Sequence, residues 1–212
     1  TDLAGNSGVA VTSLTAGSGV TVDKSTPSVT TASIASNNGS GAELAVPGNI
    51  VTLTLVTNEN IVEPTVTIAT QAATVSAGAD AQNWTAAYTM TENESNGTVP
   101  FTIDYADSAG NTAGTHTALL NDADGNEVTY DKSKPVLSNV ILKSDNSFDS
   151  TYAKSGSVVT VSFNSNEQLL TSSVAVTIAG VSRSPSKSSS WDGTKEGWVA
   201  TYTMTNATDD NG

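Results

Sequence analysis

The feature that most constrains the fold of this 212-residue chain is an internal repeat the length of a small domain. The segment Val22–Pro27 (Val-Asp-Lys-Ser-Thr-Pro) recurs 108 residues later as Tyr130–Pro135 (Tyr-Asp-Lys-Ser-Lys-Pro). The same offset relates one set of strand-like and acidic residues, Val51, Leu53, Leu55 and Glu59, to Val159, Val161, Phe163 and Glu167. A period of this length predicts tandem copies of one domain rather than a single large domain.

Two further matches set the boundaries of the repeats. Trp84–Met90 matches Trp198–Met204 with an offset of 114, so short insertions lie between the two landmarks in the second copy. Ala106–Asn111 matches the first six residues of the chain. We therefore predict three parts: residues 1–24 as the end of one repeat, residues 25–132 as a complete repeat, and residues 133–212 as a repeat without its last two strands.

Short segments with period-two alternation of apolar and polar residues, rich in Val, Ile and Thr and bounded by Gly, Asn, Asp or Pro, predict β-strands and no helix. In the complete repeat we expect strands at residues 29–35, 49–57, 64–69, 72–76, 84–91, 98–105 and 113–120, with an extended piece at 127–131. About seven short antiparallel strands per repeat are typical of an all-β, immunoglobulin-like sandwich. Its core is expected to include the alternate residues Trp84, Ala86, Tyr88 and Met90.

Composition excludes several classes of function. The formal charge of −13, with only eight Lys and Arg residues, makes nucleic acid an unsuitable partner. No apolar run approaches the roughly 20 residues that a membrane-spanning helix needs, so no membrane insertion is expected. Cysteine is absent, the single histidine is His116, and no Gly-x-Ser-x-Gly motif occurs. We therefore predict that the chain is not an enzyme and that His116 is an exposed strand residue.

Four motifs together resemble one protein family. They are the Asp-x-Ala-Gly-Asn turn, the Val-x-Asp-Lys-Ser-x-Pro linker, the Trp-x-Ala-x-Tyr-x-Met strand and the segment Gly97–Asp104. In this order and spacing they are similar to the bacterial Ig-like repeats of giant extracellular adhesins and cell-surface fibre proteins. The resemblance implies an extracellular location, cell-surface or secreted, a structural role as an extender whose partners are adjacent repeats of the same chain, and calcium bound near the junctions between repeats.

An acidic cluster is expected at one end of the sandwich. The linker before the first strand and the loops after the second and sixth strands meet at the same end of such a fold. This brings Asp23, Glu59 and Asp107 together, with Asp104 and Asn111 nearby, and the next repeat offers Asp131 and Glu167. Converging carboxylates suit calcium, which takes six to eight oxygen ligands. The alternative is that Asp107 only caps its turn, Asp23 begins the linker and Glu59 is solvated.

Other polar motifs have simpler interpretations. Residues 122–127 (Asp-Ala-Asp-Gly-Asn-Glu) lack the spacing of a calcium loop and favour an Asp-Gly turn. The acidic runs at residues 92–96 and 209–211 are expected to be solvated loop tips. Trp191 has no counterpart in the other repeat and is a candidate surface contact.

Three functions remain open at this point. The first is a stiff, calcium-bound stalk. The second is a self-assembling fibre or sheath subunit in which an incomplete sandwich accepts a strand from a neighbouring copy. The third is a glycan- or ice-binding module, suggested by the Thr-rich strands and Trp191.

Overall fold

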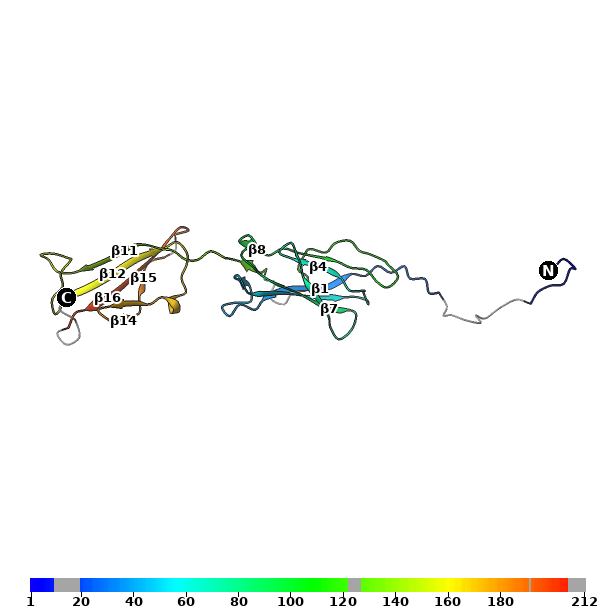
Figure 1. Ribbon diagram of the computed structural model, residues 1–212, viewed down its shortest axis with the longest axis horizontal. Coiled ribbons are helices and arrows are strands. Elements are labelled where there is room, and N and C mark those ends of the chain that lie inside the picture. Colours follow the sequence, from blue (N-terminus) through cyan, green and yellow to red (C-terminus); the bar gives the residue numbers. More distant parts are fainter. Residues whose placement is uncertain (10–19, 122–126, 191, 206–212) are drawn as a thin grey trace. The chain divides into compact units, whose positions relative to one another are not determined.

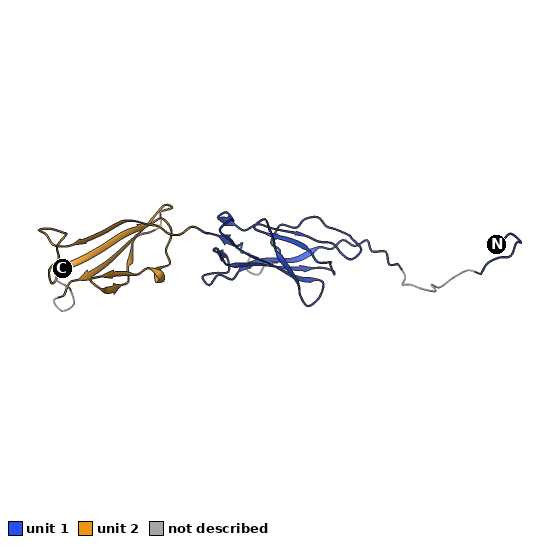
Figure 2. Ribbon diagram, in the orientation of Figure 1, with its two compact units in different colours: residues 1–132 blue, residues 133–212 orange. Residues whose placement is uncertain are grey.

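A computed structural model describes residues 1–9, 20–121, 127–190 and 192–205. The chain divides into two compact units, residues 1–132 (unit 1) and residues 133–212 (unit 2), shown in blue and orange in Figure 2. The described residues are all-β, with only the one-turn 3-10 helix η1 (Thr171–Ser173) in addition. The described part of the chain contains no helix that is long and apolar enough to cross a membrane.

The described residues of unit 1 form ten strands, and most of the strand pairs are antiparallel. Figure 1 shows several of these strands. Its main sheet has the order β1-β3-β7-β6, and two smaller sheets have the orders β5-β4-β9 and β2-β10-β8. The strands are β1 (Val29–Ser36), β2 (Leu44–Ala45), β3 (Ile50–Thr57), β4 (Thr65–Ile68), β5 (Gln71–Ala72), β6 (Thr74–Ala77), β7 (Asn83–Thr89), β8 (Gly97–Thr98), β9 (Phe101–Asp104) and β10 (Thr129–Tyr130).

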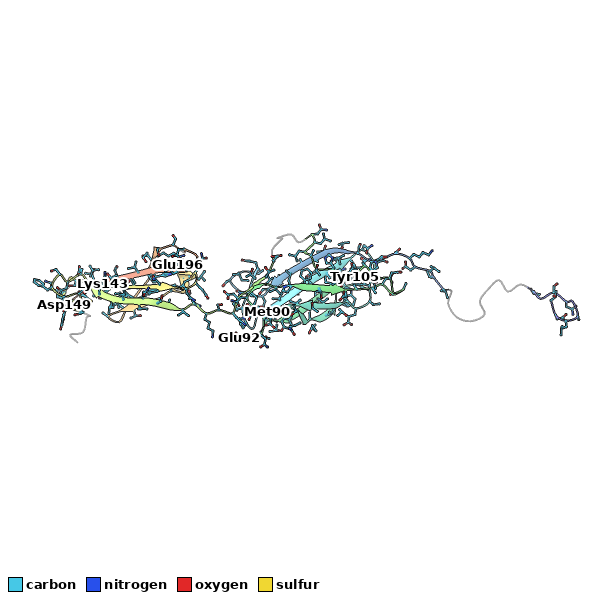
Figure 3. All side chains as sticks on the ribbon, turned by 90° about the horizontal axis from the view of Figure 1, so that it is seen from above. Met90, Glu92, Tyr105, Lys143, Asp149 and Glu196 are labelled. Atoms are coloured by element: carbon cyan, nitrogen blue, oxygen red, sulfur yellow. The ribbon has the colours of Figure 1, made fainter. Side chains whose placement is uncertain are left out.

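The core of unit 1 is enclosed by these sheets, as expected for a β-sandwich. Alternate residues of β3 and β7 are buried, among them Leu53, Leu55 and Trp84, so the period-two pattern predicts the inward faces correctly. Met90 and Tyr105, labelled in Figure 3, join the same buried cluster, while Tyr88 packs against it partly buried.

One predicted strand of unit 1 is wrong. Residues 113–120 form no regular strand but make two isolated bridges, one through His116 to Ile103 and one through Leu120 to Ala32. The segment has no period-two apolar pattern, and Gly114 takes a φ of +85°, which breaks the extended conformation. It contacts β9 through one residue and β1 through another. His116 is therefore a partly buried bridge residue rather than an exposed strand residue.

The predicted strands at 72–76 and 98–105 are each interrupted. The first divides into β5 and β6, and the second into β8 and β9 on either side of Val99 and Pro100. Proline has no N–H to donate to a sheet, so a strand is interrupted where it occurs.

Unit 2 has a main sheet with the order β11-β12-β16-β15 and a hairpin of β13 and β14. The strands are β11 (Leu137–Ser144), β12 (Val158–Ser165), β13 (Val176–Ile178), β14 (Val181–Arg183), β15 (Ser186–Ser189) and β16 (Glu196–Thr203). Strands β11 and β12 begin and end 108 residues after β1 and β3. Trp198, Ala200 and Tyr202 of β16 are buried, like Trp84 and Ala86 of β7.

Candidate metal site

Three carboxylates from distant parts of unit 1 lie together. Asp23 precedes β1, Glu59 follows β3 and Asp107 follows β9, and one oxygen of each lies within 4.8 Å of the others. Asp23 is exposed, Glu59 is half-buried and Asp107 is buried, with 5% of its surface exposed. The topology expected from sequence thus brings these three residues together.

The loops that hold Glu59 and Asp107 are joined by backbone contacts. Ile61 and Asp107 form an isolated β-bridge, and the Val62 N–H donates to the Ala106 carbonyl at 2.9 Å. The hydroxyl of Thr57 donates to the Glu59 carbonyl at 2.7 Å. The backbone that carries two of the three carboxylates is therefore held by the body of the unit.

Asp107 sits in the Asp-x-Ala-Gly-Asn turn and serves as its cap. One carboxylate oxygen accepts the backbone N–H groups of Ala109 and Asn111, each at 2.8 Å, and the other accepts the Asn111 side-chain amide at 2.7 Å. The hydrogen bond from the Asn111 side-chain amide lowers the pKa of Asp107 most strongly, and the bonds from the backbone N–H groups lower it further. Burial acts in the opposite direction but is outweighed. The residue is ionised at neutral pH.

The same turn forms at the start of the chain, outside the group of Asp23, Glu59 and Asp107. Asp2 accepts the N–H groups of Ala4 and Asn6, and the Asn6 side-chain amide, all at 2.9 Å. The turn therefore needs only its own residues. Capping explains why an aspartate occupies this position, but not why Asp23 and Glu59 lie beside Asp107.

The separations suit one hard cation. Calcium binds oxygen at about 2.3–2.6 Å, so two oxygens on one ion lie no further apart than about 5 Å. The carboxylates of Asp23, Glu59 and Asp107 meet this limit. A carboxylate has about four acceptor positions, and Asp107 uses three of them in its turn, which leaves one for an ion.

The other predicted ligands fall into two groups. Asn111 lies at the cluster, because its side-chain amide bonds Asp107 and also approaches the Asp23 carbonyl at 3.5 Å. Asp104 does not join the three converging carboxylates: it is exposed at the end of β9 and accepts the Thr115 hydroxyl. It follows the buried Ile103, so the period of the strand turns its side chain outward.

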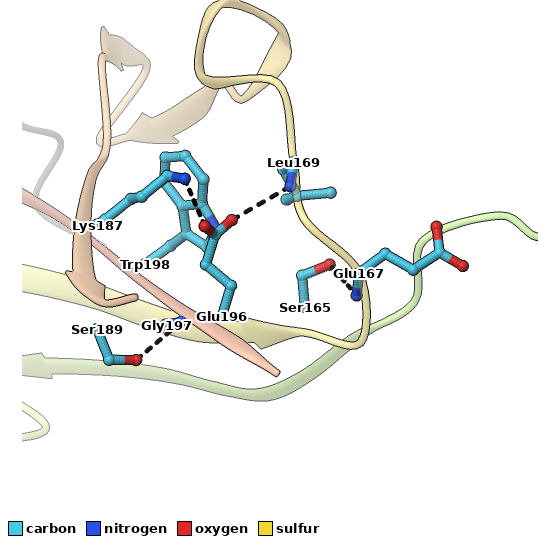
Figure 4. A network of polar contacts seen from close by, with 8 residues as sticks. All are labelled: Ser165, Glu167, Leu169, Lys187, Ser189, Glu196, Gly197 and Trp198. Carbon is cyan, nitrogen blue, oxygen red and sulfur yellow. Dashed lines mark hydrogen bonds and ion pairs between the residues drawn. The ribbon is translucent and has the colours of Figure 1, made fainter. Parts of the chain in front are cut away.

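The second predicted set lies in both units. Asp131 belongs to unit 1, where it accepts the Asn96 side-chain amide at 2.8 Å. Glu167 belongs to unit 2, where its backbone N–H donates to the Ser165 hydroxyl at 3.2 Å (Figure 4). The structure describes each residue within its own unit. The motif at 122–126, Trp191 and the acidic run at 209–211 lie outside the described residues.

Two buried glutamates were not expected from the sequence. Glu94, predicted to lie in a solvated loop tip, is buried and accepts the Tyr88 hydroxyl at 2.6 Å and the Thr91 N–H at 2.6 Å. Burial disfavours its ionisation, but the bonds from Tyr88 and Thr91 outweigh burial and lower the pKa of Glu94. The only sequence signal is the Thr-x-x-Glu spacing of a cap.

Glu196 is the second buried glutamate and lies in unit 2, at a different place in the repeat from Glu94. Its carboxylate pairs with Lys187 at 2.5 Å and accepts the Leu169 N–H at 3.2 Å (Figure 4). It also accepts the Trp198 indole N–H at 3.0 Å. Burial again disfavours ionisation, and Lys187 and the two N–H donors outweigh it and lower the pKa of Glu196. Its position two residues before Trp198 on the inward face of β16 is a signal that the sequence does contain.

Comparison of the chain with protein-family models, with curated proteins and with solved structures found no match.

Proposed function

We propose that the chain consists of tandem Ig-like repeats that act as structural extenders of an extracellular surface protein, stiffened by a calcium ion held by Asp23, Glu59 and Asp107. The observation that supports this most strongly is the convergence of these three carboxylates from separate segments. A shared strand order in the main sheets of the two units supports the repeat itself.

The cluster would link a connecting segment to a folded body. Asp23 lies in the segment that precedes Pro27 and β1, whereas Glu59 and Asp107 are held by loops of unit 1. A cation bound by all three would attach the preceding segment to the domain and restrict its motion. Proline in the same linker already limits bending. Both effects favour a stiff connection, which an extender requires.

Carboxylate charge also favours a cation at this position. Unit 1 contains 14 of the 21 Asp and Glu residues and two of the eight Lys and Arg residues. Three carboxylates within 4.8 Å of one another repel without a counterion. Calcium would remove this repulsion. At about 1 mM calcium and a dissociation constant of about 0.1 mM, binding adds about 1.4 kcal/mol to the stability of the folded state.

The test is the melting temperature of unit 1 within the whole chain, measured in chelator and then in millimolar calcium. We expect a rise of several degrees in the wild type and none in Asp107→Asn. Asp2→Asn is the matched control, because it makes the same change in the same turn away from the cluster. A calcium effect that is absent from the wild type, or that Asp2→Asn also abolishes, would contradict the proposal.

The extender role has its own measurement. Small-angle scattering in calcium should give a larger maximum dimension and a narrower distribution of distances than in chelator. A compact, folded-back particle in calcium would count against a stalk.

A further inference from the structure

Unit 2 exposes apolar residues at positions that unit 1 buries. Strand β11 is exposed along nearly its whole length, while β1, at the same place in the repeat, is mostly covered. Val140 is 64% and Leu142 is 68% exposed, whereas their counterparts Ala32 and Ile34 are 0% and 6% exposed. Soluble proteins seldom expose contiguous apolar surface of this kind without a partner.

This surface is a hollow rather than a flat face. A cavity of about 560 Å³ lies over the main sheet of unit 2, and its lining includes Val140, Leu142, Val159, Val161, Ile178 and Met204. Thr151, Tyr152 and Ala153 form part of the same rim. Among the described residues, none donates a hydrogen bond to the carbonyl of Thr151 or of Ala153.

Unit 1 shows which segment closes the equivalent position. Strand β10 runs parallel to β2, and the N–H groups of Thr129 and Asp131 donate to the carbonyls of Glu43 and Ala45 at 2.8 and 2.9 Å. The alternate residues Val128 and Tyr130 are fully buried. Glu43 and Ala45 correspond to Thr151 and Ala153 in unit 2, at the offset of 108.

The chain contains a second copy of this closing segment, and it is exposed. Val20-Thr-Val-Asp23 matches Val128-Thr-Tyr-Asp131, and the same Lys-Ser-x-Pro linker follows both. Val20 is 95% and Val22 is 76% exposed. The segment therefore has the alternation, the backbone donors and the following linker of β10, but its apolar side chains are not buried.

The two units differ strongly in net charge. Unit 2 contains six of the eight Lys and Arg residues, including Lys143 at the hollow (Figure 3) and Lys154 next to its rim. Unit 1, which includes the exposed segment, contains two cations and 14 carboxylates. Unit 2 also contains seven Asp and Glu residues, so its formal charge is −1, against −12 for unit 1. Contact between unit 1 of one copy and unit 2 of another is therefore less repulsive than contact between two copies of unit 1.

We propose that the hollow of unit 2 binds the segment Val20–Asp23 of a second copy of this chain, as a parallel strand beside Tyr152 and Ala153. The N–H groups of Thr21 and Asp23 donate to the carbonyls of Thr151 and Ala153, and Val20 and Val22 enter the hollow. This is strand addition, in which main-chain bonds supply affinity and alternate side chains supply specificity. The first copy keeps its own segment Val20–Asp23 free and the second copy keeps its own hollow free, so both can bind further copies and the copies join head to tail.

The first test is sedimentation of the whole chain over a range of concentrations. We expect the average mass to rise with concentration, and Val20→Asp or Val22→Asp to weaken association at least about tenfold, because each buries an unpaired charge. Both residues are exposed in the single chain, so folding of unit 1 is unaffected. Leu3→Asp is the control with the same charge change in another exposed residue of the terminal segment.

The second test fixes the partner and the register. The chain has no cysteine, so Thr21→Cys in one preparation and Tyr152→Cys in another can be mixed and oxidised. A disulfide between the two different chains supports the proposal, and Leu3→Cys in place of Thr21→Cys should give at least about tenfold less product. A monomer at millimolar concentration would overturn it. So would equal loss of association in Leu3→Asp, or an equal yield of the mixed disulfide from Leu3→Cys and Thr21→Cys.

Discussion

Units 1 and 2 each have a main sheet with the same strand order, but the two sheets differ in how their inner faces are covered. Strands β1, β3, β7 and β6 occur in the same order as β11, β12, β16 and β15. In unit 1 two further sheets cover the inner face, and 20 of the described hydrophobic residues form one buried cluster. In unit 2 the hairpin β13-β14 covers part of it, and the corresponding described cluster contains four buried residues.

The difference shows that the same strand pattern does not by itself determine burial. The alternation in β11 is as apolar as that in β1, with Val140 and Leu142 where β1 has Ala32 and Ile34. Ala32 and Ile34 belong to a buried cluster that includes Phe101 and Ile103, more than 60 positions further along the chain. Stability in such a fold therefore comes mainly from closing the second layer.

The largest expected effect comes from shortening one matched pair of side chains. Ile34→Ala in unit 1 should cost about 2–5 kcal/mol, because it leaves a cavity in a closed core. Leu142→Ala, at the same place in unit 2, should cost less than about 0.5 kcal/mol, because the side chain is exposed. Urea unfolding followed at the indole N–H resonances of Trp84 and Trp198 reports the two units separately. Equal losses would show that β11 is covered in solution.

A smaller effect is expected at the buried acid of unit 2. Glu196→Ala should cost about 1–3 kcal/mol, since it leaves the Trp198 and Leu169 N–H groups without their acceptor. Glu196→Gln keeps an acceptor and should recover most of the loss, and the 43% exposed Lys187 can then turn to solvent. The same unfolding experiment at the Trp198 resonance measures both variants, and Trp84 should not respond. An equal loss in the alanine and glutamine variants would show that the ion pair alone matters.

Much of the fold follows from local pattern, whereas the exceptions depend on distant partners. The sequence predicts β1, β3 and β7 to within two residues at each end, because Val51, Leu53 and Leu55 alternate with polar residues. It also predicts that the carboxylates of Asp23, Glu59 and Asp107 lie close together, because the strand order determines which loops lie at the same end of the sandwich. Burial of Glu94 was not predictable in this way, since it depends on Tyr88 and Thr91 lying beside it.

The stability of the two units should also depend differently on pH and on salt concentration. The pKa values of Glu94 and Glu196 both lie below their ordinary value of 4.5 in the folded state. Each group therefore stabilises its unit fully above about pH 4.5, and this contribution is lost as the pH falls through the lower folded pKa. We expect the melting temperature of both units to fall between neutral pH and acid, and Glu94→Gln and Glu196→Gln to reduce that dependence in their own unit only.

The groups that donate hydrogen bonds to Glu94 and to Glu196 differ in charge, so salt should affect the two glutamates differently. Glu94 accepts from Tyr88 and Thr91, which are neutral, whereas Glu196 also pairs with the partly exposed Lys187. Screening weakens ion pairs near the surface but not hydrogen bonds from neutral groups. Raising the salt concentration to about 1 M should therefore shift the acid transition of unit 2 to higher pH and leave that of unit 1 in place. A parallel shift of both transitions would mean that net charge, rather than these two carboxylates, determines the acid stability.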